Sequence, residues 1–183
     1  WIINAYPLGL AGLLLGTGTL GDKIGHRRMF EIGLTIFGIA SAVAAFAPNV
    51  GVLIGARAFL GAGAAVLMPS TLALIRQTFF EPRERNTAIG IWGSVATVGS
   101  AVGPLLGGFL LTHTWWGAVF LINIPIVIIA LVGTYLIAPD NFPNPKRNWD
   151  FMSSLYATVT MVGLVLTIEN LAHTPIDTTL VTT

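Results

Sequence analysis

Long apolar segments alternate with short polar ones along this chain, and the pattern predicts a bundle of membrane-spanning helices. Several segments without Lys, Arg, Asp or Glu reach the length of about 20 residues that a helix needs to cross a bilayer. The polar segments between them are short enough to be turns, except for one loop at 139–150 that is rich in Pro and Asn. We expect six spans: Ile2 to Leu20, Phe30 to Phe46, Gly51 to Thr78, Thr87 to Leu111, Ala118 to Ala138, and Phe151 to Leu171.

Composition agrees with this pattern. Of 183 residues, 54% are hydrophobic and only 9% are charged, whereas a soluble domain carries roughly 25% charged residues. The alternation of apolar and polar residues that a membrane β-barrel requires is absent. The predicted fold class is therefore all-α, as a polytopic membrane protein. A net charge of +1 gives no reason to expect nucleic acid, and without cysteine there are no disulfides or thiolate metal sites.

The distribution of basic residues predicts the orientation of the bundle. Of the nine Lys and Arg residues, all except Arg57 fall in or beside the links after the first, third and fifth spans. Because Lys and Arg are enriched in cytoplasmic loops, these links are predicted to be cytoplasmic. The residues are Lys23, Arg27, Arg28, Arg76, Arg83, Arg85, Lys146 and Arg147.

The densest polar stretch runs from Gly18 to Arg28, between the first two spans. Its glycines, Gly21 and Gly25, let two helices join tightly, and Asp22 sits among Lys23, His26, Arg27 and Arg28 at the water boundary. That carboxylate can pair with these bases or cap a neighbouring helix N-terminus, and such contacts can be made in one conformation and broken in another. The alternative is a topology signal with incidental pairing. Glu31 is expected to pair locally with Arg27 or Arg28.

Arg57 lies within the third span, where a charge is costly. A basic residue at membrane depth marks a functional site facing the bundle interior or a water-filled cavity by default. The alternatives are a structural ion pair, or a side chain that extends to the outer interface. Arg57 is the only basic residue of the chain at such a depth.

The fourth predicted span carries glycine at every fourth position, at Gly99, Gly103 and Gly107. Such a stripe allows close approach between membrane helices, and Pro104 removes a backbone donor at the same level. Static packing and a functional interface are both compatible with this pattern.

Nothing in the chain indicates an enzyme. Gly16 to Gly21 matches the pattern G-x-G-x-x-G, but it closes an apolar helix instead of following a strand, so no nucleotide site is expected. His26, His113 and His173 are far apart in the predicted topology, which gives no metal site. No nucleophile, base and orienting residue occur together, and no cofactor is expected.

Three of these motifs together resemble one family. The stretch Gly18 to Arg28 is similar to the motif G-x-L-x-D-[RK]-x-G-[RH]-[RK]-[RK] that joins the second and third spans of major facilitator transporters. Arg57 with Gly61 resembles the fourth-span motif of that family, and Gly99 to Gly108 resembles its antiporter motif G-x-x-x-G-P-x-x-G-G. Trp116 to Pro125 is similar to a segment of the fourteen-span drug:proton antiporters, the QacA- and SmvA-like pumps for quaternary ammonium compounds and methyl viologen.

The resemblance implies that the chain is a fragment covering roughly family spans two to seven, without the first span and the second half. Residues 1–138 would form the N-terminal transporter bundle, 139–150 a cytoplasmic loop, and 151–183 the following span with an outer tail. His26 departs from the family, where Arg is commoner at this position, and Glu31 stands where relatives are often apolar.

The resemblance also implies roles for the motif residues. Gly18, Asp22, Lys23, Gly25, Arg27 and Arg28 would belong to a cytoplasmic latch that stabilises an outward-open state. Arg57 would couple protonation to conformational change. The face of Gly99, Gly103, Pro104, Gly107 and Gly108 would set the bend of its helix and seal a helix interface against leakage.

The expected function is proton-coupled efflux of lipophilic and cationic compounds by alternating access, in a bacterial cytoplasmic (inner) membrane. Its partners would be small-molecule drugs, protons and the lipid bilayer. Two alternatives remain open: a transporter of the same fold for a lipid, siderophore or sugar, and a membrane scaffold that does not transport. The intramembrane charge of Arg57 disfavours the scaffold.

Overall fold

The computed structural model describes residues 4–144 and 151–173, and all the regular elements in these ranges are α-helices. The predicted all-α fold class is thereby confirmed. The residues outside these ranges include Lys146, Arg147 and Trp149 of the predicted cytoplasmic loop and most of the predicted outer tail. The helices are α1 (Ala5–Ile24), α2 (His26–Ala45), α3 (Val50–Thr78), α4 (Pro82–His113), α5 (Ala118–Leu121), α6 (Asn123–Ile137) and α7 (Phe151–His173).

The polar stretch between the first two spans is mostly helical. Its first seven residues complete α1, and α2 already begins at His26, so that Gly25 alone separates the two helices. Gly25 has a φ of 100°, a backbone conformation that side chains disfavour and glycine adopts readily. The sequence predicted a turn here, and the structure narrows that turn to one residue.

Four of the described helical segments are long and apolar enough to cross a membrane: His26–Ala45, Val50–Thr78, Pro82–His113 and Ala118–Ile137. Helices α1 and α7 contain shorter apolar segments, Ala5–Leu14 and Leu155–Val165. Six spans were expected; these four agree with the second to fifth of them, and the first and sixth stay predictions.

The predicted fifth span is assigned as two helices that meet at Ile122, where the backbone stays helical with φ −59° and ψ −24°. A four-residue helix, α5, ends at Leu121, and α6 starts at Asn123. Pro125 lies in the first turn of α6, where its missing N–H leaves a carbonyl of the preceding turn without its usual donor. The Asn123 side chain donates to the buried Ser41 hydroxyl of α2 at 3.3 Å, which holds this junction against α2.

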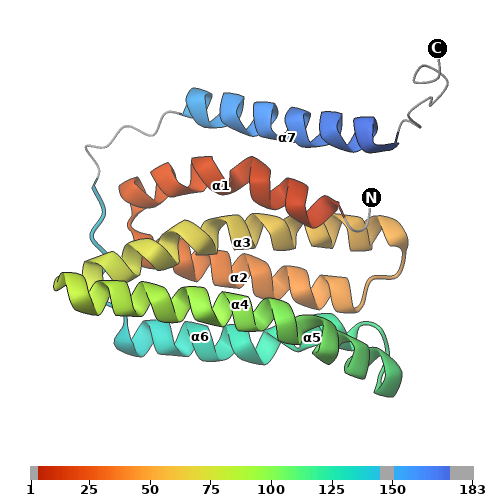
Figure 1. The fold of residues 1–183 in the computed structure, drawn as a ribbon, viewed down its shortest axis with the longest axis horizontal. Coiled ribbons are helices and arrows are strands. Elements are labelled where there is room, and N and C mark those ends of the chain that lie inside the picture. Colours follow the sequence, from red (N-terminus) through yellow and green to blue (C-terminus); the bar gives the residue numbers. More distant parts are fainter. Residues whose placement is uncertain (1–3, 145–150, 174–183) are drawn as a thin grey trace, which may run out of the picture.

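The helices run back and forth, so that their connections gather at two ends of the bundle (Figure 1). One end contains the α1–α2 turn, the α3–α4 link and the C-terminus of α6, and we call it the basic end. The other end contains the α2–α3 and α4–α5 links, where the rings of Phe46 and Trp115 lie 5.6 Å apart. The basic residues of the described links therefore share one end, as the orientation argument requires.

Small residues let α3 pack closely on α1 and α2. A Cβ built on Gly9 of α1 would lie 2.5 Å from the Ala58 carbonyl oxygen of α3, and one on Gly61 would overlap the Tyr6 carbonyl. On the other side, a Cβ on Gly63 would lie 3.0 Å from the Cβ of Phe37 in α2. Membrane helices gain van der Waals contact when small residues allow such approach. The buried core follows this pattern with Ala40, Ala44, Ala56 and Leu60.

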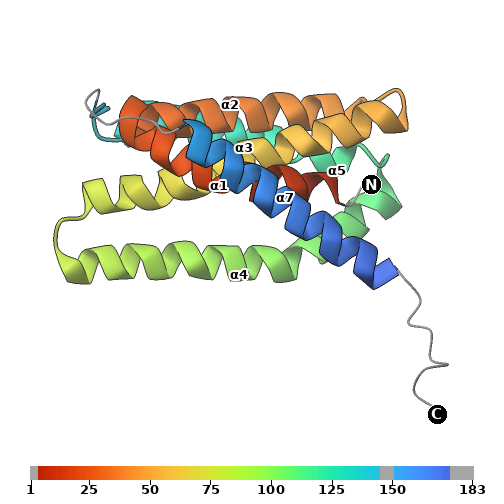
Figure 2. The ribbon, with the colours of Figure 1, turned by 90° about the horizontal axis from the view of Figure 1, so that it is seen from above.

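Helix α4 is set apart from this packed group. Among the described helices it contacts only its chain neighbours α3 and α5, and none of its residues is buried. Figure 2 shows α4 running separately along most of its length. The chain continues as an unbroken helix through Pro104.

Replacing Gly9 with leucine is expected to destabilise the complete protein by about 1–3 kcal/mol, because the side chain would overlap the α3 backbone. Thermal unfolding of the purified protein in detergent measures the change. The matched control is Gly133→Leu on α6, where a Cβ would meet no atom within 4 Å. Equal losses of stability in the two variants would contradict the close crossing of α1 and α3.

Candidate functional site

Asp22 and His26 form the first polar pair of the candidate site. They lie one turn apart across the α1–α2 turn, with the Asp22 Oδ1 3.1 Å from the His26 Nε2. The histidine side chain is 13% exposed and that of the aspartate 30%. The His26 Nδ1 faces inward, without a hydrogen-bond partner among the described residues. It lies against Gly21, where a Cβ would approach it to 2.8 Å, so that residue 21 must be small.

A cavity of about 430 Å³ opens beside this pair, between the ends of α1 and α2 and the last turns of α3. Its walls combine an acidic group, a basic group and an amide with apolar residues. Such a surface offers partners to both ends of a helix or to a charged side chain. The lining residues are Gly18, Asp22, His26, Pro69, Leu72, Ala73, Arg76 and Gln77.

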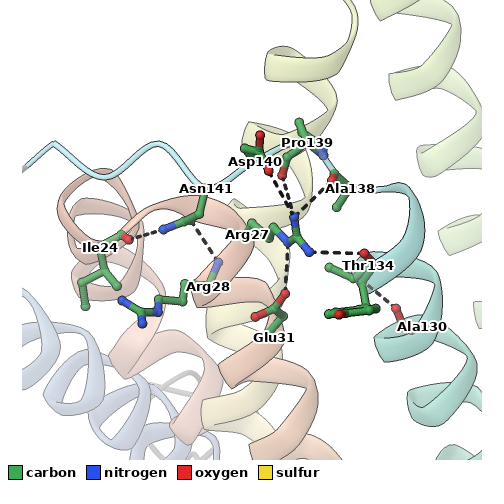
Figure 3. Close-up of polar contacts among 11 residues, drawn as sticks. Ile24, Arg27, Arg28, Glu31, Ala130, Thr134, Ala138, Pro139, Asp140 and Asn141 are labelled. Carbon is green, nitrogen blue, oxygen red and sulfur yellow. Dashed lines mark hydrogen bonds and ion pairs between the residues drawn. The ribbon is translucent and has the colours of Figure 1, made fainter.

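Arg27 binds the C-terminal end of α6 (Figure 3). Its guanidinium donates to the carbonyl oxygens of Tyr135 at 3.3 Å, Ala138 at 3.3 Å and Pro139 at 3.4 Å. The last carbonyls of a helix lack partners within the helix and carry the negative end of its dipole, so a cation stabilises them. The same guanidinium contacts two carboxylates, and we call these groups together the Arg27 cluster. The carboxylates are Glu31 at 3.2 Å and Asp140 at 4.0 Å.

This arrangement confirms the predicted local pair of Glu31 and assigns it to Arg27. It also restricts the movement of Arg27, whose side chain is only 18% exposed. Arg28, the next residue, points away from the cluster (Figure 3). Two adjacent arginines of one motif thus have different surroundings.

Asn141 bridges the ends of α1 and α2 from the segment that follows α6. Its Nδ2 donates to the Ile24 carbonyl at 2.8 Å, and its Oδ1 accepts from the Arg28 backbone N–H at 3.2 Å. The amide lies directly over Gly25, where any Cβ would overlap it. One side chain therefore satisfies an orphan carbonyl of α1 and an orphan N–H of α2 (Figure 3).

Arg57 lies in the outer half of α3, on the side of α1. Its Nε is buried and has no hydrogen-bond partner among the described residues. An unpaired polar atom of a charged side chain at this depth is costly. The structure therefore leaves Arg57 without a structural ion pair inside the described part of the chain.

The glycine motif of α4 faces open space. A Cβ on any of Gly99, Gly103, Gly107 or Gly108 would meet no atom within 4 Å. The described residues thus contain no helix that packs on this motif. The site divides into a packed part at the basic end, the unpaired Arg57, and this open face.

No group of three or more His, Cys, Asp or Glu side chains that could hold a metal ion occurs within 4–144 and 151–173. The polar groups of the site are placed for ion pairing and helix capping. The arrangement can therefore hold helix ends together.

Sequence reasoning did not identify Asn141 or the α6 carbonyls. The linker sequence Pro139-Asp140-Asn141 carries only the general signal of a turn. The pairing joins residues more than a hundred positions apart in the chain, which no local pattern reveals. The one available signal was Gly25, since a glycine beyond a helix end indicates a special backbone conformation.

Comparison with known proteins gives a family and several relatives. Residues 1–176 match the sequence profile described as the Major Facilitator Superfamily. The chain is 47% identical over 174 residues to the multidrug efflux pump LfrA of Mycolicibacterium smegmatis, an alignment that covers 94% of this chain and 34% of the pump.

Two further relatives have similar names. The chain is 50% identical over 131 residues to the methyl viologen resistance protein SmvA of Salmonella typhimurium, covering 72% of this chain and 26% of that protein. It is 34% identical over 165 residues to the multidrug resistance protein Stp of Mycobacterium tuberculosis, covering 90% and 31%. The chain thus spans about a third or less of the length of these relatives.

The two hydrogen bonds of Asn141 with Ile24 and Arg28, which we call the Asn141 bridge, predict an energetic coupling between Gly25 and Asn141. Asn141→Ala should cost about 1–3 kcal/mol, because two hydrogen bonds are lost. Gly25→Ala should lower the free energy of unfolding more in the natural protein than in the Asn141→Ala variant. In that variant the overlap between the new Cβ and the Asn141 amide disappears. Thermal unfolding of the complete protein and the double variant measures this coupling.

Asn49→Ala provides the control for that cycle. The Asn49 side chain caps α3 at the opposite end by accepting from Val52 N–H at 2.9 Å, far from Gly25. The loss of stability in Asn49→Ala should therefore simply add to the loss in Gly25→Ala. Additive effects of Gly25→Ala and Asn141→Ala would show that the bridge does not form.

Proposed function

The chain belongs to the major facilitator superfamily, and from that premise we propose that it is part of a proton-coupled exporter of lipophilic and cationic drugs. Members of this superfamily are transporters and not enzymes. The relatives named as drug efflux and drug resistance proteins carry the proposal, and the polar site at the basic end supplies a physical mechanism for it.

The proposed mechanism is alternating access, in which two helix bundles rock around a central binding site. Such rocking requires contacts at the bundle ends that form in one state and break in the other. The cavity beside Asp22 and His26 is suited to such a contact because it presents charges of both signs at a helix junction. We assign Asp22, with Gly18 and Lys23, to the part of the latch that receives another helix end.

Arg27 and Gly25 contribute differently to the proposed latch. The Arg27 cluster and the Asn141 bridge hold the α1–α2 turn against the end of α6. A latch needs such a rigid base, because a contact can resist rocking only if its own residues stay in place. Arg28 adds positive charge at the same end.

Arg57 is proposed to couple proton movement to the conformational change. Its buried, unpaired Nε supports this role. An unpaired cationic side chain favours the ionised form of a carboxyl group that comes close to it, and so promotes release of the proton from that group. The face of Gly99, Gly103, Pro104, Gly107 and Gly108 is proposed to pack on a helix beyond the described residues. Its empty surroundings support that assignment.

The proposed location is the bacterial cytoplasmic (inner) membrane, with the basic end in the cytoplasm. There the protein would span the bilayer several times and take its substrates from the lipid or the cytosol. The domain division of the sequence, with a bundle at 1–138, a loop at 139–150 and a further span within 151–183, remains part of this proposal.

Bacteria that produce the complete protein should retain less ethidium than cells without it. The expected difference arises because an exporter driven by proton re-entry removes this lipophilic cation, and a protonophore should abolish it. Fluorescence of the accumulated dye provides the measurement. Equal retention in producing and non-producing cells would refute drug export, and a difference that survives the protonophore would refute proton coupling.

Asp22→Asn should reduce ethidium efflux by about tenfold, with normal abundance of the protein in the membrane, since a buried charge contact at a helix end is worth roughly 1–2 kcal/mol. Glu84→Gln is the matched control. Glu84 is an exposed acidic residue in the first turn of α4, at the same end of the bundle, so its neutralisation should change efflux little. Unchanged efflux in Asp22→Asn would contradict the assignment of this residue to the latch.

A further inference from the structure

We propose that the outer surface of α2 at the basic end, which adjoins a groove between α2 and α3, is a binding site for one anionic phospholipid of the adjacent leaflet. The headgroup would lie at Arg28, and an acyl chain would follow α2 toward the membrane centre. The inference depends on the membrane-spanning helices and does not depend on drug export.

The first step concerns the charge of Arg28. Its side chain makes no hydrogen bond or ion pair with any residue of the described ranges, and it turns away from the Arg27 cluster (Figure 3). The nearest acidic group on the same helix, Glu31, is already paired with Arg27 at 3.2 Å. The Arg28 side chain therefore has no acidic partner among the described residues, and it lies at the end of α2 where lipid phosphates are expected. A phosphate group complements it.

The second step concerns the space beside this charge. A cavity of about 290 Å³ on the surface of α2 is lined by Arg28, Glu31, Ile32, Thr35 and Ile36. Its lining changes from charged to apolar along the helix, in the direction of the membrane centre. A lipid shows the same change from its headgroup to its acyl chains.

The third step concerns the groove that adjoins this surface. A second cavity of about 470 Å³ lies between α2 and α3, and its lining is apolar. Ile36 lines both cavities, so they adjoin at this residue. The rim residues Ile39 and Phe59 are 62% and 65% exposed, so the groove opens to the exterior of the helix pair.

The fourth step is a comparison of lengths. The rise from Arg28 to Ile39 is about 16 Å at ~1.5 Å per residue. One leaflet contributes about half of a hydrocarbon core that is ~30 Å thick. A chain whose headgroup is at Arg28 therefore ends where the α2–α3 groove begins, at Ile36, Ile39 and Phe59. Charge, chain length and groove position agree on one phospholipid.

The test measures retention of defined lipids by the purified, delipidated complete protein. Phosphatidylglycerol and phosphatidylcholine with identical acyl chains are added, and bound lipid is counted by native mass spectrometry. We expect phosphatidylglycerol to bind about fivefold more tightly, the effect of one cation near a membrane surface. Arg28→Gln should abolish this preference, and Arg28→Lys should keep most of it. Ile36→Trp should weaken both lipids equally, because it obstructs the path of the chain.

Two substitutions elsewhere serve as controls. Arg83→Gln removes an exposed cation in the first turn of α4, and Ile129→Trp enlarges an exposed apolar residue on α6. Both should leave the amounts and the ratio of the two lipids unchanged. Equal binding of the two lipids by the unsubstituted protein would overturn the proposal even if a variant fails to fold. A preference that survives Arg28→Gln, or retention that survives Ile36→Trp, would also overturn it.

Discussion

The contact of Arg27 with the last carbonyls of α6 is the interaction on which the basic end depends. A helix end at a membrane boundary has unpaired carbonyl oxygens and a partial negative charge. The Arg27 guanidinium binds the carbonyls of Tyr135 and of the capping residue Ala138, and that of Pro139 just beyond the helix. Because Arg27 belongs to the first turn of α2, the contact joins the beginning of one span to the end of another. It also brings the segment after α6 over the α1–α2 turn, where Asn141 pairs with both helix ends. Gly25 permits this arrangement, since its backbone conformation and the overlying amide both exclude a side chain.

Away from this end the bundle depends on close packing. Lipid tails are as apolar as the helix surfaces, so the hydrophobic effect does not drive helices together within the membrane. They associate instead through van der Waals contact and hydrogen bonds. Gly9 and Gly61 bring α1 against α3, while Thr17 donates to the Ala65 carbonyl at 2.8 Å across the same interface. Ser41 and Asn123 form the equivalent polar contact between α2 and the predicted fifth span. Side chains of the described core are small for this reason, and Ala44 and Ala65 are fully buried.

The sequence predicted the class of the fold and most of the helix positions because apolar length and charge distribution are local properties. It also singled out Gly25, Asp22 and Arg57, whose residue types are unusual in their surroundings, and the roles of these residues in transport stay predictions. It placed the limits of the polar turn too widely, since charged residues continue a helix as readily as they end one. Pro125 indicates a kink in the predicted fifth span, but no local pattern locates the interruption at Ile122. Asn141 could not be identified, because its role depends on a contact between segments that are distant in the chain.

The two arginines that end the polar stretch show how one motif can serve separate purposes. Arg27 is enclosed by α6 and by Glu31, so it contributes to a rigid base, whereas the Arg28 side chain extends outward beside an apolar surface. Asp22, one turn earlier, lines a third environment, the polar cavity next to Arg76. A helix turn of this kind presents its side chains about 100° apart, so consecutive positions must meet different surroundings. The charge density of the stretch therefore reflects several independent contacts, and substitutions within it should be interpreted residue by residue.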